Sequence, residues 1–233
     1  MPKKGSNIKL YIVIILMVAL AVTTITFVYN YQKANNPQNV TIGLHVGDTF
    51  TYKLTGSDEL YSSNADPNQE YPNFQELNNT NYYQVNITGI SGPVVTFVTN
   101  WAFNNGTIIQ QTGSVNVSSG AQTGQSGFWA IYPANLNVGS LTRPGGYDQI
   151  TVNGTDTQTF STSTRARNHF QVSDQFYDTN DPTQSTYRNE FDDVYFDKQT
   201  GMLTTLTDIQ EYNNPEMTLI ISWNLVSCSV WSV

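Results

Sequence analysis

The feature that most constrains this chain is an alternation of apolar and polar residues with a period of two after residue 40. Phe50, Tyr52 and Leu54 alternate with threonine and lysine, and a bulkier run from Met217 to Leu225 repeats the pattern. Side chains of a strand point alternately to its two faces, so this pattern is typical of antiparallel strands that are buried on one side. We therefore predict a mainly β protein.

Turn signals separate the alternating runs. Asn105-Gly106 and Asn153-Gly154 favour two-residue hairpin turns, because both central residues of such turns adopt a positive φ. Residues 155–164 are polar on both faces and predict a solvated edge strand. We expect one antiparallel β domain over residues 41–233, built as a curved sheet, a half-barrel or a sandwich.

An apolar segment precedes the β region. Residues 10–28 carry no charge, and as a helix they would nearly cross the hydrocarbon core of a bilayer, which is about 30 Å thick. Lys3, Lys4 and Lys9 precede the segment, and the positive-inside rule keeps such residues in the cytoplasm. We predict a single-pass protein of the cell membrane with a cytoplasmic tail over 1–9, a transmembrane signal anchor over 10–28, a linker over 29–40 and an extracellular domain over 41–233.

Two other interpretations of the apolar segment remain open. Ala19-Leu20-Ala21 fits the small-x-small motif of a cleaved signal peptide, and Lys4-Gly5 before an apolar run is similar to a pilin-type processing signal. All three interpretations place the β domain outside the cytoplasm.

Charge is scarce in this chain and unevenly distributed. Only 12% of the residues are charged, against about 25% in a typical soluble domain, and the formal net charge is −8. Residues 1–33 contain four lysines and no acid, so the remaining chain holds six basic and eighteen acidic side chains and sums to −12. This negative balance excludes an ordinary nucleic-acid-binding protein.

Three motifs carry a resemblance to a group of proteins. They are Gly47-Asp48-Thr49-Phe50-Thr51-Tyr52 at the start of the domain, the run from Pro133 to Gly139, and the run from Val194 to Leu203. Together they resemble uncharacterised archaeal surface proteins with one membrane anchor and one extracellular β domain. The resemblance implies an antiparallel sheet curved around a core, similar to the half-barrels of lipoprotein carriers. It implies no catalytic residues.

Enzyme motifs are absent from the sequence. His45 and His169 lie in separate strand-like runs, no serine lies in a Gly-x-Ser-x-Gly motif, and no His-Glu-x-x-His occurs. Cys228 is the single cysteine, so no internal disulfide can form, and no basic neighbour in the sequence lowers its pKa. We expect neither catalytic activity nor a cofactor.

One group of acidic residues is a candidate for catalysis or cation binding. It comprises Glu190, Asp192, Asp193 and Asp197. On a strand, Asp193 and Asp197 share one face and Asp192 lies on the other. Two carboxylates on one face can serve glycoside hydrolysis or bind a cation. We favour the alternative, a solvated hairpin whose carboxylates pair with arginines, namely Arg165, Arg167 or Arg188.

Two loops present side-chain oxygens at a spacing similar to that of a calcium loop. The first contains Asn64, Asp66, Asn68 and Glu70, and the second contains Asp178, Asn180 and Asp181. Both lack the glycine that the sharp turn of a calcium loop needs. We therefore expect no dedicated metal site.

Six sequons for N-glycosylation follow the apolar segment, at Asn39, Asn78, Asn86, Asn105, Asn116 and Asn153. Their number is no greater than chance gives in a chain so rich in Asn, Ser and Thr. Asn86 lies on the polar face of its strand, and Asn105 and Asn153 lie in hairpin turns. We predict that some of these sites are glycosylated.

The sequence favours a non-enzymatic surface protein with a role in envelope structure, adhesion or ligand presentation, whose partners are envelope proteins or glycans. One alternative is a carrier for a lipid or another apolar ligand, lined by Phe97, Trp101, Trp129 and Trp223. Another is a glycan-active enzyme that uses the carboxylates of residues 190–197. A last alternative is a filament subunit whose terminal strand, 216–232, completes a neighbour's sheet.

Overall fold

The computed structural model describes residues 40–60, 77–124, 130–214 and 216–233. They form one antiparallel sheet of ten strands that does not close, which confirms the predicted mainly β fold. The strands are β1 (Thr49–Leu60), β2 (Thr80–Ser91), β3 (Val94–Phe103), β4 (Ile108–Asn116), β5 (Gln122–Thr123), β6 (Gly154–Phe160), β7 (Ser163–Tyr177), β8 (Tyr187–Asp197), β9 (Leu203–Asn213) and β10 (Glu216–Cys228). The predicted anchor over 10–28 lies outside the described residues, and within the described part of the chain no helix has the length and apolar character to span a bilayer.

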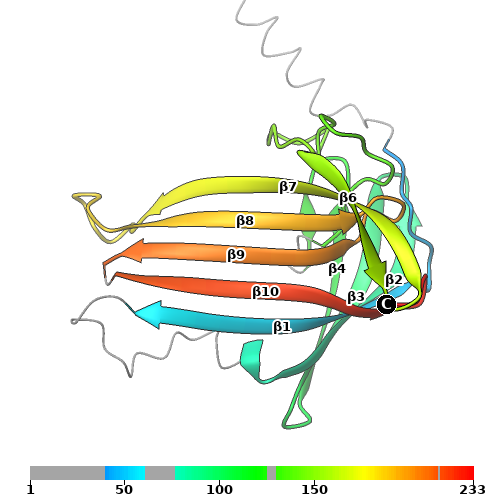
Figure 1. Ribbon diagram of the computed structural model, residues 1–233, viewed down its shortest axis with the longest axis horizontal. Helices are drawn as coiled ribbons and strands as arrows, with labels where there is room; N and C mark the ends of the chain where they lie inside the picture. The colour runs from blue at the N-terminus through cyan, green and yellow to red at the C-terminus, as the bar shows by residue number, and fades with distance from the viewer. Residues whose placement is uncertain (1–39, 61–76, 125–129, 215) are drawn as a thin grey trace, which may run out of the picture.

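The sheet consists of two meanders that meet at β1. Its strand order is β5-β4-β3-β2-β1-β10-β9-β8-β7-β6, so β1 separates the chain-local series β2 to β5 from the series β6 to β10. In Figure 1, β7 to β10 and β1 form one layer, and β2 to β4 run across it at a steep angle. The sheet is therefore strongly curved.

The positions of β6 and β10 in the sheet test two predictions. β6 forms one edge, and its side chains alternate between partly buried and exposed up to the buried Phe160. The edge strand predicted over 155–164 is therefore confirmed for residues 155–160, but its end was wrong, because the chain turns at Ser161 and Thr162 and continues as β7. β10 lies in the middle of the sheet, paired with β1 on one side and β9 on the other. The expectation that residues 216–232 complete a neighbour's sheet is wrong, because that strand already has both partners within its own chain.

The segment between β5 and β6 packs against both halves of the sheet. Its described part, residues 130–153, contains buried Ile131 and Tyr132. The backbone N–H of Tyr132 donates to the carbonyl of Gly201 (2.8 Å), on the turn between β8 and β9, and Ile131 forms a β-bridge with Met202. A connection of this length that carries its own buried side chains is usually functional.

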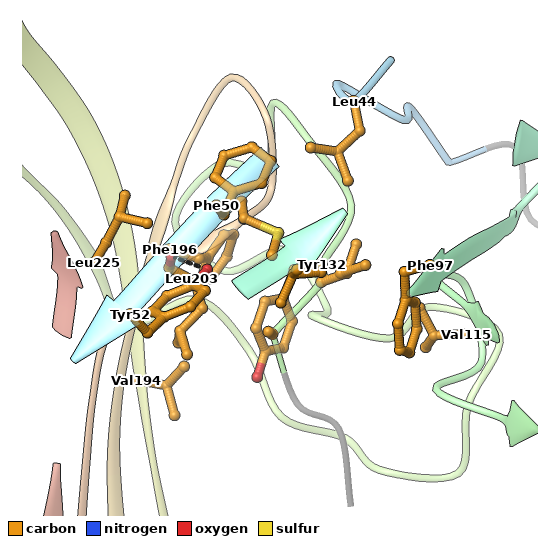
Figure 2. Packing of buried hydrophobic residues seen from close by; sticks show 14 of the residues in the cluster. Leu44, Phe50, Tyr52, Phe97, Val115, Tyr132, Val194, Phe196, Leu203 and Leu225 are labelled. Atoms are coloured by element: carbon orange, nitrogen blue, oxygen red, sulfur yellow. Dashed lines mark hydrogen bonds between the residues drawn. The ribbon is translucent and has the colours of Figure 1, made fainter. Parts of the chain in front are cut away.

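The core lies between the curved sheet and residues 130–153, which we call the crossing segment (Figure 2). Phe50 and Tyr52 of β1 are fully buried, and the Tyr52 hydroxyl donates to the carbonyl of Leu203 (2.9 Å). Phe97 of β3 is also fully buried, in the other half of the sheet. Each such side chain contributes about 2–3 kcal/mol through burial, so one continuous apolar cluster stabilises both halves.

Candidate functional site

A cavity of about 580 Å³ opens beside the core, a size within the range of small-molecule sites. Its walls come from β3, the crossing segment and β7 to β10. The lining residues are Leu77, Trp101, Ala130, Tyr132, Thr142, Arg143, Asp148, Ile150, Phe170, Val172, Asp174, Phe176, Glu190, Asp192, Val194, Leu203, Leu206, Asp208, Ile221 and Trp223. Most of these side chains are apolar or aromatic, and the polar ones gather in two groups.

The aromatic wall is held in place by specific contacts. The indole N–H of Trp101 donates to the Thr80 hydroxyl (2.7 Å), and Trp223 packs edge-on against Tyr83 with ring centroids 4.9 Å apart. Of the four aromatic residues that the sequence suggested for an apolar ligand, Trp101 and Trp223 line the cavity. Phe97 is part of the filled core instead, and Trp129 lies outside the described residues.

An acidic cluster, which comprises Glu190, Asp192 and Asp208, occupies one wall of the cavity. One carboxylate oxygen from each residue lies within 4.8 Å of the others. Asp192 and Asp208 stand directly opposite each other on β8 and β9, and Glu190 lies two residues from Asp192 on the same face. Asp174 on β7 is opposite Glu190 and also lines the cavity.

A β-bulge brings Asp208 into this cluster. Near the turn, Phe196 pairs with Leu203, but from Tyr195 onward the register of β8 and β9 is shifted by one residue. Without the shift Asp192 would face Thr207, and Asp208 would point to the opposite side of the sheet.

The cluster is electrostatically strained because its like charges are partly removed from water. Burial, followed by the charges of Asp208, Glu190 and Asp174, raises the pKa of Asp192 to about 7. Burial also raises the pKa of Asp208, although a hydrogen bond from Gln210 partly opposes this rise. One cation is adjacent: the Arg188 guanidinium donates to a Glu190 oxygen (2.8 Å). One arginine does not balance the carboxylates that face the cavity.

A second polar group, Tyr132 and Arg143, lies on the crossing segment. The Arg143 side chain is buried, its guanidinium lies over the Tyr132 ring (4.4 Å to the centroid), and one of its N–H groups donates to the carbonyl of Val117 (3.0 Å). The Tyr132 hydroxyl is buried and has no hydrogen-bond partner among the described residues. Burial raises the pKa of Tyr132; Arg143 opposes the rise and Asp192 adds to it.

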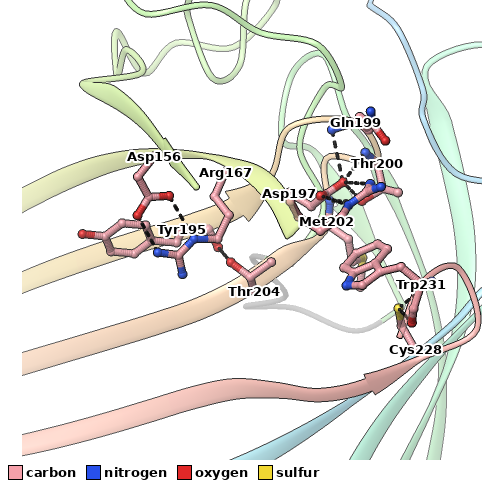
Figure 3. Close-up of polar contacts among 11 residues, drawn as sticks. Asp156, Arg167, Tyr195, Asp197, Gln199, Thr200, Met202, Thr204, Cys228 and Trp231 are labelled. Carbon is pink, nitrogen blue, oxygen red and sulfur yellow. Dashed lines mark hydrogen bonds and ion pairs between the residues drawn. The ribbon is translucent and has the colours of Figure 1, made fainter. Parts of the chain in front are cut away.

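The structure divides the acidic group that the sequence singled out. Glu190 and Asp192 face the cavity, whereas Asp193 points to the opposite face of β8. Asp197 is fully buried and accepts two hydrogen bonds from Arg165 (2.8 and 2.9 Å) and one from the backbone N–H of Thr200 (2.7 Å), as Figure 3 shows in part. Asp197 thus organises the turn after β8.

The predicted pairing of these carboxylates is confirmed for two of the three arginines, but the expectation of a solvated hairpin is wrong for Asp197, which is fully buried. Arg165 pairs with Asp197 and Arg188 with Glu190. Arg167 pairs with Asp156 of β6 (2.6 Å), outside the group (Figure 3).

The other residues considered from sequence lie away from the cavity. His45 is exposed beside Asp48, and His169 packs against Tyr195. Burial raises the pKa of the Cys228 thiol, which donates to the carbonyl of Trp231 (3.2 Å) and is therefore a poor nucleophile (Figure 3).

Of the two calcium-like loops, the one with Asp178, Asn180 and Asp181 lies within the described residues. The oxygens of Asp181 accept hydrogen bonds from Thr183, Ser185 and Thr186, which hold the pKa of that carboxyl well below its usual range. Its lone pairs are therefore occupied by its own turn. Residues 64–70 lie outside the described residues. Within the described ranges, the acidic side chains close enough to share a cation are Glu190, Asp192 and Asp208.

The asparagine side chains of the glycosylation sequons differ in their hydrogen bonds and in their exposure to solvent. Asn105 is exposed, and its side-chain oxygen accepts a hydrogen bond from the backbone N–H of Thr107 (2.9 Å). Asn78 instead bonds both the N–H and the carbonyl of Gly56 (2.9 Å each). Asn86 and Asn116 are partly buried, and Asn39 lies outside the described residues. Asn153 is exposed, but the hairpin turn predicted at Asn153-Gly154 is wrong, because Gly154 is the first residue of β6 and pairs with His169. Glycosylation itself stays a prediction.

Sequence reasoning missed Asp208, Asp174, Tyr132 and Arg143. Asp174 interrupts the apolar face that Phe170, Val172 and Phe176 form on β7, and this is the signal that could have marked it. Asp208 lies on a face of β9 that is already mixed, so the sequence carries no such signal for it. Comparison with known proteins adds no assignment: no family model matches the chain, and no curated protein shows significant similarity to it.

Proposed function

We propose that the β domain is a non-enzymatic binding module that holds a small, largely apolar molecule in the cavity between the curved sheet and the crossing segment. The observation that carries this proposal is the cavity of about 580 Å³ with aromatic walls. Those walls are oriented by hydrogen bonds and ring contacts, so a ligand meets a surface that costs little to order. This is the carrier alternative of the sequence analysis.

The location belongs to the same proposal. A signal anchor over residues 10–28 would place the domain on the cell surface, where binding serves ligand presentation or uptake into the envelope. The scarcity of charge in the domain is compatible with an extracellular location. A purely structural or adhesive role leaves the cavity and its polar groups without a purpose.

Hydrolysis of glycans has less support. A glycosidase needs two carboxyl groups that flank the scissile bond, whereas Glu190, Asp192 and Asp208 gather on one wall of the cavity with oxygens within 4.8 Å of one another. Arg188 also occupies one of the Glu190 oxygens.

Binding of the neutral dye Nile red to the full-length protein tests the proposal. Val172 lines the cavity and is partly buried, so Val172→Trp fills space where the dye would lie. Val226 is exposed and does not line the cavity, which makes Val226→Trp the matched control. We expect saturable fluorescence enhancement that Val172→Trp weakens at least tenfold and Val226→Trp leaves unchanged. Equal binding by both variants would show that the dye sits elsewhere and would reject the cavity as a ligand site.

A further inference from the structure

We infer that the cavity selects molecules in which an apolar body carries a protonated amine, with Glu190, Asp192 and Asp208 receiving the ammonium group. This inference rests on the proposed binding function and names its ligand class. It requires that the cluster lacks a sufficient counter-charge, that a further polar group points to a ligand, and that an amine fits better than a metal ion.

The charges that face the cluster do not balance. From β7 comes Asp174, from β8 come Arg188 and the two cluster carboxylates, and from β9 come Asp208 and Tyr212. The crossing segment adds Arg143 and Asp148 at the same cavity. Arg143 is directed to Tyr132 and to the carbonyl of Val117, so among the described residues Arg188 is the cation in contact with the cluster. A bound cation would relieve the repulsion between carboxylates that burial strengthens.

A second observation, independent of the acidic cluster, also points to a ligand. The Tyr132 side chain is only 2% exposed, it lines the same cavity, and its hydroxyl has no partner among the described residues. Figure 2 shows this hydroxyl directed away from Leu44 and Phe50. A buried hydroxyl without a partner costs about 1–3 kcal/mol, which a polar ligand group can recover.

An ammonium group fits this site better than a divalent metal ion. An ammonium carries three N–H donors, which three converging carboxylates can accept, and aromatic faces such as Trp223 attract cations. Calcium takes six to eight oxygens, whereas Gln210 is engaged with Asp208 and Tyr212, and Arg188 already holds Glu190. The cavity also extends beyond the cluster along apolar walls. A metal ion bound at the cluster would leave this apolar space unfilled, whereas the apolar body of an amine would occupy it.

Displacement of Nile red from the full-length protein at pH 8 tests the inference, with octylamine, 1-octanol and octanoate as competitors of equal chain length. We expect octylamine to displace the dye at concentrations at least tenfold lower than 1-octanol, which corresponds to about 1.4 kcal/mol, and octanoate to be weakest. Asp192→Asn with Asp208→Asn should abolish the advantage of octylamine and leave 1-octanol unchanged. The matched control, Glu211→Gln with Glu216→Gln, removes two exposed carboxylates that do not line the cavity and should keep the advantage.

The outcomes separate this inference from the proposed function. If octylamine and 1-octanol displace the dye equally, the amine inference fails and the apolar binding site stands. If the dye itself shows no cavity-dependent binding, the proposed function fails. If calcium chloride quenches octylamine binding at micromolar concentration and stabilises the wild-type protein but not the double Asn variant, the cluster is a metal site and the amine inference is overturned.

Discussion

Asp192→Asn should stabilise the protein at alkaline pH and have almost no effect on its stability near pH 4. In the folded protein the pKa of Asp192 is about 7, against an ordinary value of 3.8. The folded state therefore binds the proton more tightly than the unfolded state, and this carboxyl makes the free energy of unfolding fall as pH rises from about 4 to about 7. Asparagine keeps the shape of the side chain and removes this dependence.

The size of the effect follows from the same pKa. The difference between the two pKa values corresponds to about 4 kcal/mol for a fully desolvated group, but Asp192 is only partly buried and solvent screens its neighbours, so we expect about 1–2 kcal/mol. For a domain of this size, that raises the melting temperature by about 3–8 °C at pH 8.

Thermal unfolding of wild type and Asp192→Asn, followed by circular dichroism at pH 4, 6 and 8, measures this effect. Groups that titrate in both proteins cancel in the difference between them. A difference that is the same at all three pH values, or a variant that is less stable at pH 8, would refute the idea that the cluster holds unrelieved negative charge.

Three further predictions concern the rest of the fold. Asp197→Asn should lower the free energy of unfolding by about 3 kcal/mol in urea titrations, because it breaks a buried pair with Arg165; a loss below 1 kcal/mol would contradict that role. Gly201→Ala should destabilise more than Gly139→Ala in the same assay, since both have positive φ but only Gly201 would place a Cβ against the backbone of the crossing segment. On protein from its native host, mass spectrometry of glycopeptides should find Asn105 modified and Asn78 unmodified, and the reverse pattern would contradict the hydrogen-bond argument.

The strands could be predicted from the sequence because each depends on its own side chains. Phe50 and Tyr52 alternate with exposed or partly buried neighbours, and both are fully buried in the sheet. The polar run from Thr155 also indicated the edge strand of the sheet, although this strand ends at Phe160 and the run continues through the turn into β7. These are local properties, and a single sequence contains them.

The candidate site could not be predicted because it depends on relations between strands. Asp192 meets Asp208 only through the shifted register of β8 and β9, and alternation within one strand carries no information on such a shift. Tyr132 reaches the cavity on an irregular segment whose path is fixed by backbone bonds to the turn at Gly201. The acidic residues near 190 were visible in the sequence, but their separation into cavity-facing and turn-forming groups required the fold.

The junction at β1 has a consequence for how the two meanders share stability. β1 pairs with β10 along its length, but its pairing with β2 covers only Thr49 to Tyr52, after which the Asn78 side chain substitutes for a strand at Gly56. The backbone pairing between the halves is thus short, and the shared apolar cluster and the contacts of the crossing segment hold the two halves together. Amide hydrogens of β3 and β4 should therefore exchange through partial openings that leave β8 to β10 intact. In such an opening the half that contains β2 to β5 separates from the half that contains β6 to β10, which stays folded.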